Sequence, residues 1–165
     1  MLFRRSFVGV LALAAAMPAS AHGPENGPGH IMSGGKPGQA GKVTRIIDVV
    51  AADNAFSLKS LQVKDGETVR FVLRNDGIEP HELIIGTVTE HAEHRKMMRN
   101  MIERQKKGEP AHSMVGMEHM SGVSVESGQT ATFVWIFART PDLEFACNMP
   151  GHYEDGMKGA IAFIR

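Results

Sequence analysis

Three side chains with metal-binding donors recur at equal intervals near the C-terminus. Cys147, His152 and Met157 offer a thiolate, an imidazole and a thioether, five residues apart. Pro150 and Gly151 lie between the first two and allow the backbone to turn sharply, so the three side chains can converge on one point. The spacing predicts a metal site on a single tight loop.

A second imidazole would complete this donor set. His81 is the candidate, because it lies between two predicted strands, Thr68–Leu73 and Glu82–Ile85. Taken singly, a buried cysteine or a loop histidine is more often a core or solvated residue. Two histidines, one cysteine and a weak axial methionine are together the donors of electron-transfer copper sites, whereas zinc rarely takes a thioether. The sequence therefore predicts copper at His81, Cys147, His152 and Met157.

Other classes of function fit less well. A Cys147–His152 nucleophile pair lacks an orienting third group and an oxyanion hole, and multicopper oxidases or copper nitrite reductases need His-x-His pairs, of which the sequence has none. We therefore expect no enzyme. The chain has 18 Lys and Arg against 18 Asp and Glu, so no global field favours nucleic acid.

The N-terminus has the pattern of a secretory signal peptide. Arg4 and Arg5 precede an apolar run over 7–17, and small residues follow at 19–21. We expect cleavage after Ala21 and a periplasmic protein without a transmembrane segment, since the run is too short to span a bilayer. In that oxidising compartment Cys147 would be buried, paired with another chain or bound to metal.

Composition then divides the remaining chain. Residues 22–41 contain seven Gly and three Pro, which predicts a flexible arm. From residue 42 to residue 165, about eight short β-rich runs with alternating faces predict one domain, an all-β antiparallel sandwich. These runs are 43–50, 56–63, 68–73, 82–85, 123–125, 130–137, 143–146 and 159–164.

A long excursion, at about 86–121, interrupts the strands. Its first part, His91–Lys107, has strong helix formers and no Gly or Pro, so it predicts a helix. The excursion is rich in soft donors, which suit Cu(I), although methionines at helical spacing are as often core residues. The basic face of the helix suits an acidic partner or simple solvation. The candidate secondary donors are His91, His94, Met98, Met101, His112, Met114, Met117, His119 and Met120, and His22 would add an amine–imidazole pair after cleavage.

The Phe-x-Cys, Pro-Gly-His and downstream Met pattern resembles the copper loop of the cupredoxins, the family of plastocyanin, azurin, rusticyanin and auracyanin. The loop spacing resembles rusticyanin and auracyanin more than plastocyanin. The resemblance covers Lys42–Arg165 without the excursion and implies a Greek-key β-sandwich with one type 1 copper. It makes His81, Cys147, His152 and Met157 the ligands and His152 the ligand at the solvent edge. It also implies an apolar rim around His152, formed by Met149, Pro150 and Tyr153, and amide groups near the sulfur from Asn75 and Asn148.

Two functions follow from this resemblance. The excursion resembles that of periplasmic cupredoxins linked to copper tolerance, of the CopI kind, and plain carriers have no use for so many extra donors. We therefore favour copper handling, with a copper-exporting or copper-oxidising protein as partner. The alternative is a dedicated electron carrier between periplasmic redox partners.

Overall fold

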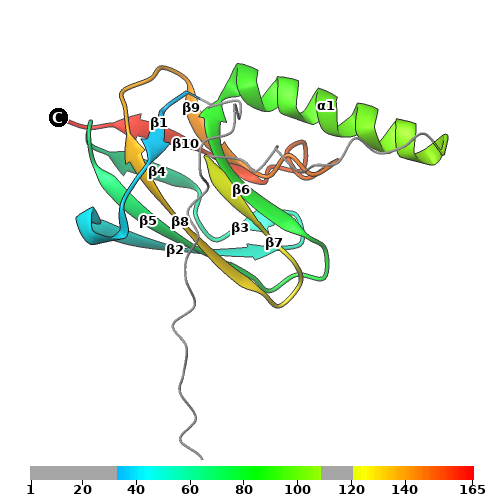
Figure 1. Cartoon of the computed structure of the whole chain (residues 1–165), viewed down its shortest axis with the longest axis horizontal. Helices are drawn as coiled ribbons and strands as arrows, with labels where there is room; N and C mark the ends of the chain where they lie inside the picture. The colour runs from blue at the N-terminus through cyan, green and yellow to red at the C-terminus, as the bar shows by residue number, and fades with distance from the viewer. Residues whose placement is uncertain (1–32, 109–120) are drawn as a thin grey trace, which may run out of the picture.

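The computed structural model describes residues 33–108 and 121–165, which form two facing β-sheets with one long helix beside them (Figure 1). Each sheet has five strands, in the orders β1-β8-β5-β2-β3 and β4-β10-β9-β6-β7. The expected β-sandwich with a helical insertion is confirmed. In chain order the elements are β1 (Gly35–Pro37), a 3₁₀ turn (Ala40–Lys42), β2 (Arg45–Ala52), β3 (Ala55–Phe56), β4 (Ser60–Val63), β5 (Thr68–Asn75), β6 (His81–Thr87), α1 (Val88–Lys106), β7 (Gly122–Val125), β8 (Thr130–Phe137), β9 (Leu143–Ala146) and β10 (Lys158–Phe163).

The strand pairing differs from a purely antiparallel sandwich. β2 pairs with β5 and β4 pairs with β10 in parallel, while the other neighbours are antiparallel. The antiparallel prediction is wrong at these two pairs, because the chain crosses from one sheet to the other between β3 and β4. For the same reason the single strand expected at 56–63 is divided into two strands of different sheets.

Alternate side chains of β5 fill the space between the sheets. Val69, Phe71 and Leu73 are fully buried, whereas Arg74 is exposed, because successive residues of a strand point to opposite faces. Trp135 of β8 is also fully buried there. Burying one such large apolar side chain stabilises the fold by about 1.5–3 kcal/mol, so this core fixes the strand ends from which the candidate ligands extend.

β6 is buried on both of its faces. Every residue from 81 to 86 is buried. Leu83 and Ile85 belong to the core between the sheets, whereas Ile84 is fully buried but lies outside that core. The helix α1 packs against β6 and β9 and supplies this outer cover (Figure 1).

The helix begins earlier than the sequence indicated, at Val88 instead of His91. Thr87 and Glu90 form a capping box, in which the Thr87 hydroxyl accepts from the Glu90 N–H and the Glu90 carboxylate accepts from the Thr87 N–H. β6 therefore continues into α1 with no intervening loop. The residues of α1 that are buried are His91, His94 and Met98.

The sandwich also begins earlier than expected. Gly35–Pro37 forms β1 and pairs with β8, so the prediction of an arm that ends at residue 41 is wrong for these residues. The Trp135 indole N–H donates to the carbonyl of Gly34 at 3.1 Å. A Cβ on Gly35 would lie against the Ile136 carbonyl and the Trp135 indole, so the glycine that suggested flexibility is required for close packing.

Several predictions concern residues outside the described part of the chain. They are the signal peptide 1–21, its cleavage after Ala21, the donor His22, and the donors of segment 109–120, which are His112, Met114, Met117, His119 and Met120. Within residues 33–108 and 121–165, no helix combines the length and apolarity that crossing a membrane requires.

Candidate metal centre

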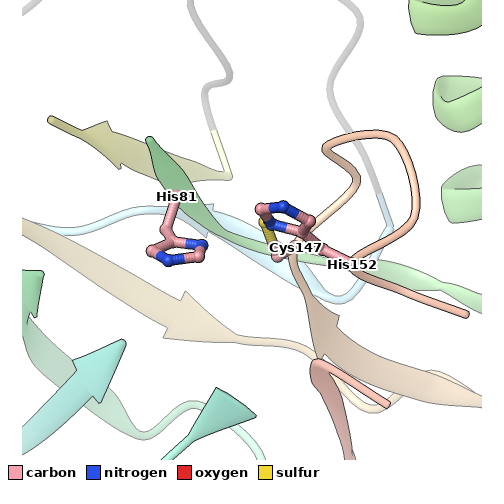
Figure 2. A group of neighbouring side chains, drawn as sticks. All are labelled: His81, Cys147 and His152. Carbon is pink, nitrogen blue, oxygen red and sulfur yellow. The ribbon is translucent and has the colours of Figure 1, made fainter. Parts of the chain in front are cut away.

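Three candidate ligands come together at one end of the sandwich. His81 begins β6, Cys147 directly follows β9, and His152 lies in the loop that leads to β10 (Figure 2). One donor atom from each lies within 4.8 Å of the others, and all three residues are buried. The Cys147 Sγ and the His152 Nδ1 are 3.4 Å apart. The sequence-based grouping of these residues therefore matches their positions in space.

The His81 ring shows that this cluster fits a metal ion. Both of its nitrogens are buried and neither makes a hydrogen bond, although Nε2 lies 3.6 Å from the Asp53 carboxylate. Burial, and then the nearby His152, hold the pKa of His81 below its ordinary value, so this ring stays neutral. A neutral imidazole with an unused lone pair is the form that binds a metal, and a bound cation would satisfy the nitrogen that the protein leaves unpaired.

Cys147 is a free, fully buried cysteine. Burial raises the pKa of its thiol to about 12. The backbone N–H of Glu82 points toward its sulfur at 3.5 Å, which stabilises negative charge there. A soft metal cation would displace the thiol proton and leave the thiolate as its ligand.

Backbone hydrogen bonds close the loop around these donors. The Cys147 N–H donates to the Met157 carbonyl at 3.0 Å, and the Met157 N–H donates to the His152 carbonyl at 2.9 Å. Gly151 adopts a φ of +92°, a conformation that suits glycine. Met157 is fully buried, and its backbone is bonded directly to the two loop residues of the cluster. Its thioether remains the predicted fourth donor.

Glu82 is a functional residue that sequence reasoning missed. We expected Asn75 to lie in the hydrogen-bonding shell of the sulfur. Instead, its amide donates to the carbonyls of Glu79 and Val125. Glu82 supplies the N–H to sulfur, and its carboxylate accepts from the Asn148 N–H at 2.8 Å. The available signal was its position, directly after the candidate ligand His81, as the only acidic residue of the strand His81–Thr87.

The helix α1 contacts the same segment from the other side. His91 Nδ1 lies 3.0 Å from Asn148 Oδ1, and its Nε2 lies 3.4 Å from the Glu144 carbonyl oxygen. Asn148 therefore contacts α1 through its side chain, not the sulfur. Tyr153 also differs from the prediction of a solvent-edge rim, because it is buried and its hydroxyl donates to the Glu144 carboxylate at 2.6 Å.

The secondary donors on α1 belong to no further group of three or more His, Cys, Asp or Glu side chains in the described part of the chain. Among the described residues, the only group of three or more His, Cys, Asp or Glu side chains close enough to hold a metal is the His81–Cys147–His152 cluster. His91, His94 and Met98 are buried against the sandwich, which favours their packing role. Met101 is half-buried near the C-terminal end of the helix.

Comparison with known proteins agrees with this chemistry. Residues 44–163 match the family described as copper binding proteins, plastocyanin/azurin family. The chain is 39% identical to the copper-resistant cuproprotein CopI of Pseudomonas aeruginosa, over 93% of this chain and 91% of that protein. It is 38% identical to the protein of the same name from Rubrivivax gelatinosus, over 77% of this chain and 71% of the relative.

Solved structures show the same fold. Auracyanin B superposes with a TM-score of 0.61 at 18% identity, over 81% of this chain and 97% of auracyanin B. The reduced auracyanin of Roseiflexus castenholzii gives a TM-score of 0.54 at 21% identity, over 74% of this chain and 98% of its own. Three findings agree with one another. The family match covers residues 44–163, the Pseudomonas aeruginosa relative aligns over nearly the whole length of both chains, and the His81–Cys147–His152 cluster is buried. The chain therefore belongs to the plastocyanin/azurin family of copper-binding proteins, the cupredoxins.

Proposed function

We propose that this protein is an exported cupredoxin that serves copper tolerance. The observation that carries the proposal is the buried His81–Cys147–His152 cluster, whose donors lie within 4.8 Å of one another. The relatives named copper-resistant cuproproteins support the physiological role, since they share more than a third of its residues over most of its length.

The four ligands would be His81, Cys147, His152 and Met157. When bound, copper supplies a one-electron change between Cu(I) and Cu(II). The chain's part is to keep the donors in place through that change. His81 and Cys147 adjoin neighbouring paired strands, β6 and β9, and the Cys147–Met157 hydrogen bond closes the loop. Donors held this firmly need little rearrangement, which suits rapid electron transfer.

Copper handling is favoured over simple electron transfer because of the additional donors. The segment 112–120 carries His112, Met114, Met117, His119 and Met120, and several weak thioether sites close together raise the chance of recapturing Cu(I). A copper-exporting or copper-oxidising protein would then be the partner. The signal pattern of residues 1–21 supports export to the periplasm, and the intact mass of the exported protein tests whether it begins at His22.

A dedicated electron carrier is the second candidate. It is favoured by the exposure of the cluster: His152 is 6% exposed, whereas His81 and Cys147 are fully buried. Electrons would therefore pass most readily at the His152 edge. In both cases the protein moves copper or electrons and carries out no bond-making reaction of its own.

Copper titration of the purified protein tests the main site. We expect one copper with intense visible absorption from the thiolate, because Cys147 is the only cysteine. Cys147→Ser should abolish this band while circular dichroism shows an unchanged fold. If the Ser variant keeps the band, or the native protein never develops one, the proposed function is wrong.

A further inference from the structure

The outer edge of His152 is covered by an acidic side chain. The His152 Nδ1 faces the Cys147 sulfur at 3.4 Å, while its Nε2–H donates to the Glu79 carboxylate at 2.9 Å. The Glu79 side chain is itself 59% exposed. The ligand nearest the surface is thus bonded to a carboxylate that remains in contact with solvent.

The loop that carries Glu79 is held in place by several hydrogen bonds. The Asn75 amide donates to the Glu79 carbonyl at 2.7 Å, and the Asp53 carboxylate accepts from the Ile78 N–H at 3.0 Å and from the Glu79 N–H at 3.4 Å. The Ser127 hydroxyl donates to the Gly77 carbonyl at 2.7 Å. Contacts from β5 and from the segments after β2 and β7 therefore fix the backbone beneath Glu79.

We propose that Glu79 is a positioning and specificity residue: its carboxylate holds His152 in the tautomer that leaves Nδ1 free for copper, and its charge makes the exposed edge selective for cationic electron partners. The inference rests on the proposed copper site. Neutral imidazole carries one N–H, so a carboxylate that accepts from Nε2–H leaves the lone pair on Nδ1. The same charge attracts cations and repels anions that approach His152.

Two substitutions separate these effects. Glu79→Gln keeps a carbonyl oxygen that can accept from Nε2–H but removes the charge, whereas Glu79→Ala removes both. Glu103→Gln is the matched control, since it removes one exposed charge from the distal part of α1. Both positions are exposed, so the three variants are expected to fold.

The first measurement uses the copper-free protein. Nitrogen-15 chemical shifts of His152 should show Nε2–H and a bare Nδ1 in the native protein, in Glu79→Gln and in the control. Glu79→Ala should show a mixture of the two tautomers. This result does not depend on copper, so it stands or falls separately from the loss of the visible band that would refute the proposed function.

The second measurement uses the Cu(I) protein and two one-electron oxidants. One electron leaves Cu(I), giving Cu(II), and reduces either anionic hexacyanoferrate(III) or cationic tris(phenanthroline)cobalt(III). At low ionic strength, Glu79→Gln and Glu79→Ala should raise the ratio of the anionic to the cationic rate by about threefold or more. The inference is overturned if Glu79→Ala keeps the native tautomer, or if the Glu79 variants change the rate ratio no more than Glu103→Gln does.

Discussion

Burial and one backbone donor determine the environment of the Cys147 sulfur. The thiol is fully buried and its pKa is raised to about 12, so it stays protonated until a cation takes the place of the proton. The Glu82 N–H at 3.5 Å is a donor to the sulfur. Amide donors of this kind withdraw negative charge from a thiolate and so help to set the potential of a bound metal.

The axial role of Met157 can be tested directly. Met157→Leu preserves the volume and apolarity of the side chain but removes the thioether. We expect the variant to bind copper with a higher reduction potential, because loss of a weak axial donor disfavours Cu(II). Protein-film voltammetry measures this change.

The matched control for this prediction is Met149→Leu. Met149 lies in the same loop and packs against the core, but it belongs to no predicted ligand set, so its substitution should leave the potential near the native value. If Met157→Leu has an unchanged or lower potential, Met157 is not the axial ligand.

At this scale the sequence groups the candidate ligands His81, Cys147 and His152 correctly but misses the residues around them. Cys147, His152 and Met157 are recognisable because they share one short loop, and His81 because it adjoins a strand. Glu79 and Glu82 escape sequence reasoning because their contacts join segments far apart in the chain: Glu79 lies 73 residues from His152, and Glu82 lies 66 from Asn148. The spacing of residues along the sequence does not indicate contacts between such distant segments.

The helix α1 connects the metal loop to a second layer of side chains. Its N-terminal half carries His91, which contacts the Asn148 side chain, and Arg95. The guanidinium carbon of Arg95 lies over the Tyr153 ring, 3.5 Å from the ring centroid. Asn148 directly follows Cys147, so α1 stabilises the loop residue next to the candidate thiolate ligand. The helix is therefore part of the support for the site as well as an insertion between β6 and β7.

The capping box determines how firmly this helix is attached. Thr87→Ala removes the hydroxyl that accepts from the Glu90 N–H, and we expect the free energy of unfolding to fall by about 0.5–2 kcal/mol. Thr89→Ala is the matched control, since Thr89 is exposed in the first turn and caps nothing. Urea denaturation of both variants measures the difference. Equal losses of stability would show that the cap contributes nothing specific.

His91 makes stability depend on pH. Burial holds its pKa below the ordinary value of 6.5. The nearby Glu144 opposes this shift to a smaller extent, and the like charge of Arg95 adds to it. Below about pH 6.5 the unfolded chain binds a proton at this residue that the folded protein does not, so stability falls as the pH falls. We expect His91→Gln to lose less stability than the native copper-free protein between about pH 7.5 and 5.5.

Lys96→Gln provides the comparison, because Lys96 is exposed on the same helix. Its stability should follow the native pH profile, as urea denaturation at each pH would show. A native profile that is no steeper than that of His91→Gln would mean that His91 does not remain neutral in the folded protein.

The elements themselves were only partly predictable. Strongly alternating segments such as β5 and β8 are found close to the expected positions, because period-two burial is local information. The division of 56–63 between two sheets and the addition of β1 depend on tertiary pairing, which local composition does not reveal. Gly34 and Gly35 suggested a flexible arm, yet the fold uses them for close approach to Trp135.

On the scale of the whole molecule, the question is why a small electron-transfer fold carries extra soft donors. An electron carrier needs one bound copper and a surface at which its partner docks. The sandwich can hold the copper, and the surface around His152 can serve for docking. A protein that intercepts Cu(I) gains from each added thioether. The methionines at 114, 117 and 120 recur at every third residue, so they are the donors to test.

We expect the mature protein to bind more than one equivalent of Cu(I). Replacing Met114, Met117 and Met120 with Leu should remove the surplus and leave the visible band unchanged, because Leu keeps the apolar volume but offers no ligand. The matched control, the α1 triple, replaces Met97, Met98 and Met101 of α1 with Leu. This variant should retain the additional Cu(I) binding, since Met98 is buried against the sandwich. Titration with a competing Cu(I) chelator counts the equivalents in each protein.

Growth distinguishes the two functions. If the surplus donors serve copper tolerance, a strain that lacks the protein grows normally until copper is raised, and the variant with Leu at 114, 117 and 120 restores tolerance less well than the α1 triple. If the protein is instead a dedicated carrier, the strain fails in respiration at ordinary copper and both triples restore growth equally, because each leaves the four main ligands intact. A single bound Cu(I) equivalent combined with that respiratory defect would therefore assign electron transfer to the protein and a structural role to the insertion.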